Sequence, residues 1–174
     1  DQSINRINDE KRGEYLGEFS GDDKILSVNL LGYYELLSYD LSNHFSENIV
    51  LLEKYESQKV VVAVYYHGVK EQFYIKKFII QDSSKKVSFI DTHKDSYLEL
   101  VFFEVDYNIK IEFLKPRGQV ARPLEVMDPS IFISTKGLSA MGNQLSRHKI
   151  KQMSLIERNQ KEAHVDIPDL ENSH

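Results

Sequence analysis

A gapless repeat of short apolar segments is the feature that most constrains the fold. Residues 25–28 read ILSV, residues 61–64 read VVAV and residues 97–100 read YLEL, and each segment follows the previous one by 36 residues. A repeat of this length, built of strand, tight turn, strand and connector, is typical of a propeller-like architecture. We therefore predict an all-β fold with about three repeats. Regular hairpins alone can produce similar matches, so the pattern leaves both origins open.

Glycines and polar turns divide the apolar segments into hairpins. Glycine can adopt the positive φ of a tight hairpin turn, so Gly32 and Gly68 are assigned to turns. We expect hairpins at residues 24–30 with 33–39, at 59–66 with 70–80 and at 96–104 with 107–114. Further strands are expected at residues 14–19 and 48–55, and a strand or short helix at 149–157. These elements place the folded domain at residues 14–157, between a flexible lead at 1–13 and a disordered tail at 158–174.

The composition supports one core and removes several kinds of site. The 174 residues include ten Tyr and nine Phe, and 41% of them are apolar, which is enough for one domain. The absence of Cys excludes disulfides and thiolate zinc sites, and it fits a reducing compartment. No run approaches the roughly 20 apolar residues that span a bilayer. We expect a cytoplasmic protein without a membrane partner. Because the chain opens on Asp1 rather than on Met, we also expect a fragment or processed product.

The sequence shows no catalytic or metal-binding constellation. Its six His residues are scattered, without a helical i, i+4 pair or a carboxylate in metal-ligand spacing. The adjacent carboxylates at residues 9–10 and 22–23 are typical of solvated turns. There is no glycine-rich phosphate loop, and no triplet of acid, base and nucleophile. We therefore predict no catalytic residue, no metal site and no cofactor in this chain.

One basic stretch contrasts with the acidic remainder of the chain. Residues 129–156 contain Lys136, Arg147, Lys149 and Lys151 without any Asp or Glu, whereas the whole chain has a formal net charge of −5. Spaced cations with glycines and amide side chains between them suit a phosphate backbone. These four residues are the leading candidates for contacts with such a backbone.

Other residues join this candidate set with weaker support. Lys and Arg neutralise phosphates, and small residues let backbone amides approach the nucleic acid. For Lys76 and Lys77 a solvated strand face is an equal alternative, because adjacent strand residues point to opposite sides. The remaining candidates are Arg117 and Arg122 as cations, and Gly137, Gly142 and Asn143 as positions of close backbone approach.

Three passages carry a family likeness. They are residues 4–8 (INRIN) with 12–19 (RGEYLGEF), the strand and turn units at 24–78, and residues 127–129 (MDP) with 132–137 (FISTKG) and 142–146 (GNQLS). Together they resemble the C-terminal domain of the A subunit of bacterial DNA topoisomerase IV, a type IIA topoisomerase related to gyrase. The resemblance implies a β-pinwheel, which is a propeller-like ring whose blades exchange strands, with a basic rim that binds DNA.

The resemblance also implies what this chain lacks. Type IIA enzymes cleave DNA with a Tyr that follows an Arg, and no Arg-Tyr pair occurs here, so the nucleophile is expected outside this chain. ATP and Mg²⁺ are likewise expected elsewhere in the holoenzyme, with the B subunit as partner through a missing N-terminal part. Three repeats are fewer than in complete family members, which implies an incomplete ring. Residues 115–119 (KPRGQ) do not match the gyrase box that supports tight DNA wrapping.

The expected function is therefore DNA binding without sequence preference, in a domain that is not itself an enzyme. The domain would position duplex DNA for strand passage, decatenation and relaxation in the bacterial cytoplasm, associated with the nucleoid. Two alternatives stay open: the C-terminal domain of gyrase A, and a propeller-like scaffold whose acidic N-terminal face docks a partner protein.

Overall fold

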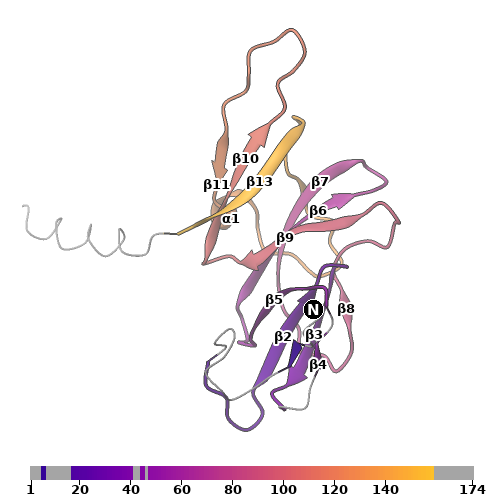
Figure 1. Ribbon diagram of the computed structural model, residues 1–174, viewed down its shortest axis with the longest axis vertical. Helices are drawn as coiled ribbons and strands as arrows, with labels where there is room; N and C mark the ends of the chain where they lie inside the picture. The colour runs from indigo at the N-terminus through magenta and orange to yellow at the C-terminus, as the bar shows by residue number, and fades with distance from the viewer. Residues whose placement is uncertain (1–4, 7–16, 41–43, 46, 159–174) are drawn as a thin grey trace, which may run out of the picture.

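The computed structural model describes residues 5–6, 17–40, 44–45 and 47–158, and these form strands with one short helix (Figure 1). The element bounds are β1 Asn5–Arg6, β2 Lys24–Asn29, β3 Tyr33–Ser38, β4 His44–Phe45, β5 Ile49–Lys54, β6 Val60–His67, β7 Gln72–Ile79, β8 Val87–Ser88, β9 Tyr97–Phe103, β10 Tyr107–Phe113, β11 Glu125–Met127, α1 Pro129–Phe132, β12 Asn143–Gln144 and β13 Ile150–Glu157. The all-β prediction is confirmed. No helix among the described residues has the length and hydropathy needed to cross a bilayer.

The strands form three main antiparallel sheets with one plan, which we call blades 1, 2 and 3. Blade 1 has the order β5-β2-β3-β8, blade 2 has β9-β6-β7-β12, and blade 3 has β13-β10-β11. Each blade thus places its first strand (β2, β6 or β10) between the two strands that follow it in the blade. The described strands leave these sheets separate, and none closes on itself. β1 and β4 form a further two-stranded pair.

Neighbouring blades exchange strands. β8 lies between β7 and β9 in the chain, yet it pairs with β3 of blade 1, and β12 likewise leaves the connector of blade 3 to pair with β7. Each exchanged strand is followed by a buried apolar residue, Phe89 or Leu145. Their N–H groups donate equivalent bonds of 2.9 Å, to the carbonyls of Gly32 and Phe73. Within the described residues, no strand occupies this fourth position on the outer edge of β11.

The 36-residue repeat relates blade 1 to blade 2 but does not extend to blade 3. The β2–β5 ladder has an irregularity between Val28 and Asn29, and the β6–β9 ladder has its irregularity 36 residues later, between Val64 and Tyr65. The third expected copy is wrong. Residues 97–100 lie in β9, which pairs with β6 as β5 pairs with β2. The strand of blade 3 that corresponds to β2 and β6 is β10. Because β9 and β10 belong to different sheets, residues 96–114 do not form the predicted hairpin.

Several smaller predictions also have an outcome. Gly32 has a φ of 87°, as its turn requires, whereas in the second turn the positive φ of 57° belongs to Glu71 and not to Gly68. The expected strand at 14–19 is wrong over residues 17–19, which carry no strand, and its first part lies outside the described residues. The lead and the tail also lie mostly outside them, although Asn5–Arg6 of the expected lead forms β1. Residues 150–157 are a strand.

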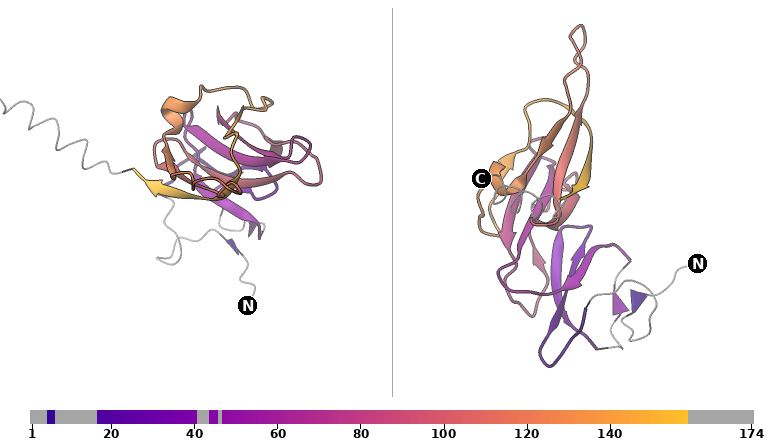
Figure 2. Two further views of the ribbon diagram at one scale, coloured as in Figure 1. Left: turned by 90° about the horizontal axis from the view of Figure 1, so that it is seen from above. Right: turned by 90° about the vertical axis from the view of Figure 1, so that its left-hand side faces the viewer.

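Blade 2 is buried on both faces, and this explains its unbroken apolar sequence. Alternate β6 residues point to opposite sides, so Val61 and Ala63 pack toward blade 1 while Val62 and Val64 pack toward blade 3. All four of these side chains are fully buried. The right view of Figure 2 shows blade 2 between the other two sheets. The two core clusters therefore fix blade 3 relative to blade 1 through the central sheet.

Candidate nucleic-acid interface

The clearest concentration of exposed cations is at one end of blade 3. β10 ends at Phe113, which pairs with Ile150 at the start of β13, and the Leu114 N–H donates to the Lys149 carbonyl at 2.9 Å. This pairing brings the loop at residues 114–124 beside residues 147–151, although the two are far apart in sequence. Six exposed cations result, which we call the basic end: Lys115, Arg117, Arg122, Arg147, Lys149 and Lys151.

Phe113 organises the base of this surface. The guanidinium of Arg122 lies 5.4 Å from the centre of the Phe113 ring, and the His148 ring meets Phe113 edge-on at 6.0 Å. Arg122 also lies 3.7 Å from the carboxylate of Glu125. Within the described residues, the salt bridges include none to Arg147, Lys149 or Lys151. Those three charges are therefore available to an external anion.

Lys136 is exposed but lies away from the basic end. Its N–H donates to the Lys77 carbonyl at 2.9 Å, whereas Leu145, just before Arg147, bonds to Phe73 on the same strand. The two attachment points are four residues apart on β7, about 13 Å at roughly 3.3 Å per residue. Lys136 is therefore not counted in the basic end.

The structure argues against Lys76 as a phosphate contact, because the side chain is buried with 3% exposure. Its ammonium donates to the carbonyls of Leu138 at 2.7 Å and Ala140 at 3.0 Å. It also lies 5.9 and 5.6 Å from the ring centres of Tyr65 and Phe78. Burial lowers the pKa of Lys76 from 10.5 to about 8. The residue holds the loop after α1 onto blade 2.

Lys77 is also turned inward, with 5% exposure. Its ammonium lies 2.6 Å from the Glu104 carboxylate and donates to the Pro129 carbonyl at 3.2 Å. Both faces of β7 are covered, so adjacent lysines that point to opposite sides are both buried. Because both side chains are buried, Lys76 and Lys77 do not fit their predicted role as phosphate contacts on the surface.

The small residues of the Lys-Gly and Gly-Asn passage mainly serve packing against β7. A Cβ on Gly142 would lie 2.3 Å from the Ile75 carbonyl oxygen, and its φ is +88°. Asn143 pairs with Ile75 as part of β12, and the Tyr65 hydroxyl donates to the Met141 carbonyl at 2.6 Å. Gly137 has open space around it and Asn143 is exposed, so these two positions keep room for a ligand.

Comparison with known proteins supports the arrangement of blades. A family described as "Topoisomerase C-terminal domain, Bacteroidota" matches residues 6–157. The chain belongs to this family. No curated protein matches it.

This topoisomerase C-terminal domain also resembles a solved structure described as "Crystal structure of the C-terminal domain of DNA topoisomerase IV". The TM-score is 0.51 at 11% sequence identity, over 80% of this chain and 48% of that chain. The domain therefore has a topoisomerase IV-like β-pinwheel fold and spans about half the length of that neighbour. At this identity the likeness concerns the fold alone.

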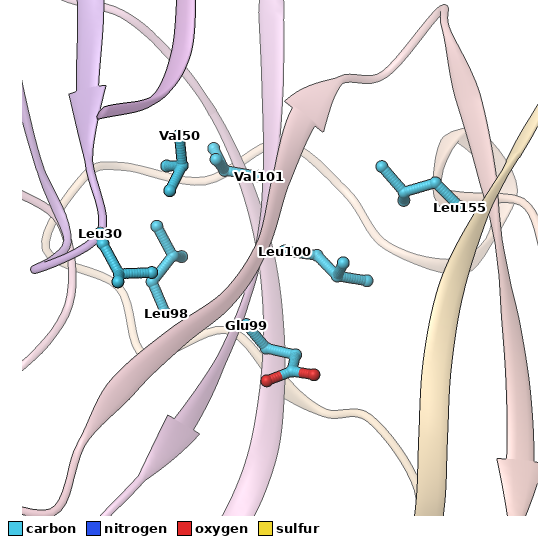
Figure 3. A pocket seen from close by; sticks show the side chains of 7 residues that line it. All are labelled: Leu30, Val50, Leu98, Glu99, Leu100, Val101 and Leu155. Carbon is cyan, nitrogen blue, oxygen red and sulfur yellow. The ribbon is translucent and has the colours of Figure 1, made fainter. Parts of the chain in front are cut away.

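Other parts of this topoisomerase domain offer little chemistry. No group of His, Cys, Asp and Glu in the described part of the chain could hold a metal ion. Asp23 accepts the Ser20 N–H at 2.8 Å, and this backbone bond is the main cause of its lowered pKa. A shallow hollow of about 200 Å³ lies where the three blades meet (Figure 3). Its lining is apolar apart from one carboxylate: Leu30, Val50, Leu98, Glu99, Leu100, Val101 and Leu155.

Sequence reasoning missed Lys115 and did not recognise the loop at 114–124 as a unit. The Lys-Pro-Arg-Gly signal marked a loop correctly. Its position opposite Arg147 and Lys149 depends on the pairing of β10 with β13, whose residues are about 40 positions apart in sequence. The available signal was the absence of acids from residues 114–124.

Proposed function

We propose that this topoisomerase C-terminal domain binds duplex DNA without sequence preference through the basic end of blade 3. The main support is the convergence of exposed cations from two separate segments at one end of a three-stranded sheet. Within the described part of the chain, Arg122 is the one member with a salt bridge, which it forms with Glu125. Lysine and arginine contacts of this kind neutralise phosphates and release condensed counterions, which gives affinity without base recognition.

In this proposal the domain serves a type IIA enzyme of the topoisomerase IV kind and performs no chemistry itself. Cleavage by a Tyr nucleophile, and the use of ATP and Mg²⁺, belong to other parts of the holoenzyme that include the B subunit. The domain would hold a DNA segment for strand passage, decatenation or relaxation, in the cytoplasm at the nucleoid. Residues 115–119 lack the gyrase box, and this favours topoisomerase IV over gyrase.

A salt titration tests the binding. If the basic end neutralises four to six phosphates, the logarithm of the affinity should fall with the logarithm of salt concentration with a slope of roughly −3.6 to −5.4. The measurement is fluorescence anisotropy of a labelled random-sequence duplex at several salt concentrations. Binding that is independent of salt would contradict the proposal.

Charge reversal tests the location. The triple variant Arg147→Glu, Lys149→Glu and Lys151→Glu should bind at least about tenfold more weakly and have a shallower salt slope. The matched control reverses three exposed lysines on other parts of the surface, Lys70→Glu, Lys85→Glu and Lys94→Glu. It changes the net charge equally, so equal losses in both variants would contradict the assignment. Circular dichroism should show that both variants keep the fold.

The scaffold alternative has weaker support. It requires basic residues that are scattered or paired with acids from other strands. Lys136 does lie apart from the others, but the six cations of the basic end share one end of blade 3. If the domain binds no duplex DNA, this result would favour the scaffold alternative.

A further inference from the structure

The loop between β10 and β11 is an insertion relative to the other blades. The equivalent turn spans residues 30–32 in blade 1 and residues 68–71 in blade 2, which is three and four residues. In blade 3 it spans residues 114–124, which is eleven residues. Figures 1 and 2 show this loop projecting well beyond the end of the sheet. We call residues 114–124 the finger. Its length is not needed to connect the two strands, because the repeat makes the same connection with three or four residues.

The finger combines cations with exposed apolar side chains. It contains Lys115, Arg117 and Arg122 and no acid. Val120 is 87% exposed, and Leu114 and Leu124 are 47% and 53% exposed. Phosphate contact accounts for the cations but gives no role to apolar groups that face water. A surface that is both cationic and apolar suits a partner in which negatively charged groups lie next to less polar ones.

The base and the tip of the finger are both conformationally restricted. At the base, Arg122 lies against the Phe113 ring, and Leu114 bonds to Lys149. At the tip, the Gln119 N–H donates to the Pro116 carbonyl at 3.1 Å, and Gly118 has a φ of 74°. Because proline fixes its own φ, Pro116 limits the tip further. Arg117 therefore lies within a tight turn at the tip of the loop.

We propose that the finger inserts its tip into the minor groove of the duplex held by the basic end, and bends that duplex. This inference rests on the proposed DNA binding. The minor groove is about 6 Å wide and concentrates negative potential, which attracts an Arg side chain. Proteins that bind it without strong sequence preference combine Arg or Lys with apolar groups that press on base steps. Arg117 supplies the cation, and Val120 with Pro116 supplies the apolar contact.

The neighbouring cations suit this placement. Arg147, Lys149 and Lys151 flank the base of the finger through the pairing of β10 with β13. With the tip in the groove, these residues face the phosphates that border it. Their contacts would stabilise a duplex that bends around the tip. The finger thus determines the geometry of the bound DNA, while the flanking cations supply most of the salt-dependent affinity.

The test compares the 174-residue chain with two finger variants. The first carries Arg117→Ala and Val120→Ser, two exposed positions whose change leaves the base of the finger intact. The second replaces residues 114–124 by the four residues of the blade 2 turn, Gly68-Val69-Lys70-Glu71. The matched control is Lys70→Ala with Val69→Ser, which likewise removes one cation and one valine, from the shorter turn where Val69 is 65% exposed. Thermal unfolding should show that each variant keeps the fold.

Two measurements use an A·T-rich duplex labelled at both ends. Binding of the unmodified chain should change end-to-end energy transfer as expected for a bend of roughly 20–90°. Netropsin, which occupies the minor groove, should weaken its binding at least about tenfold. Both effects should disappear in the two finger variants and persist in the control.

The outcomes separate this inference from the proposed function. If the unmodified chain binds DNA but neither bends it nor responds to netropsin, the inference is wrong and the proposed function stands. Competition by methyl green without competition by netropsin would overturn it by placing the finger in the major groove. If the unmodified chain binds no duplex at low salt, the proposed function itself is wrong.

Discussion

Lys76 places its ammonium between the carbonyls of Leu138 and Ala140, where burial lowers its pKa to about 8. The unfolded chain has the ordinary value of 10.5, so between these two values it binds more protons than the folded chain. Stability should therefore rise with pH through this window, by at most about 1.4 kcal/mol per pH unit. Below pH 8 the cost of burying the charged form is fully present.

The variant Lys76→Met should lack this increase. Urea unfolding at pH 7.5 and 9.5 measures the free energy of unfolding of both proteins, with the exposed Lys94→Met as control. Burial raises the pKa of Tyr65 from 10.0 to about 12. Above about pH 10 the unfolded chain therefore binds fewer protons at this residue than the folded chain, and Tyr65 lowers the free energy of unfolding as pH rises. The range below that pH isolates Lys76. An identical pH dependence in all three proteins would contradict the assignment.

Gly142 and Gly137 form a matched pair within one loop. Gly142 has a φ of +88°, and an added Cβ would meet the Ile75 carbonyl at 2.3 Å, whereas Gly137 has open space. Gly142→Ala should lower the free energy of unfolding by at least about 2 kcal/mol, through backbone strain and displacement of β12. Gly137→Ala should change it by less than about 0.5 kcal/mol. Urea unfolding measures both, and similar losses would show that contact with β7 does not require Gly142.

At the scale of elements, strand exchange makes a connector part of its neighbour's core. Phe89 follows β8 in the connector of blade 2, yet it packs in the core cluster that contains Leu26 and Tyr34 of blade 1. Its ring centre lies 5.1 Å from that of Phe78. Phe89→Ala should cost about 3–5 kcal/mol, as for other buried Phe residues.

Amide hydrogen exchange shows where this loss acts. In Phe89→Ala, exchange should accelerate in β3 of blade 1 as well as in β8, because the two strands are paired. The control Ser88→Ala changes an exposed residue of the same strand and should have little effect. Unchanged exchange in β3 would mean that β8 does not stabilise blade 1.

The same scale shows what periodicity can and cannot predict. The strands of the first two hairpins and β5 were predicted within about two residues, because β-branched runs and turn residues are local signals. The third hairpin was wrong, because β9 and β10 are also consecutive apolar strands with a short link. Their composition does not indicate that β9 pairs with the preceding strand β6 and that β10 belongs to a different sheet. Pairing partners depend on the packing of blades.

At the scale of the whole molecule, the charge is unevenly distributed. The chain has a net charge of −5, yet blade 3 presents six exposed cations at one end. Such asymmetry would orient an approaching polyanion toward the basic end and away from the acidic remainder of the surface. The central blade, buried on both faces, holds that end in a fixed relation to blade 1.

The sequence by itself determined the all-β class, the related strands of blades 1 and 2, and the acid-free stretch that contains Arg147, Lys149 and Lys151. These follow from local composition and spacing, which the chain carries wherever it folds. Only the tertiary structure decided that Lys76 and Lys77 are buried, because their exposure depends on the loop after α1 and on Glu104, which lie far away in sequence. It also decided that the finger stands beside Arg147 and Lys149, since the pairing of β10 with β13 joins segments that no local pattern connects.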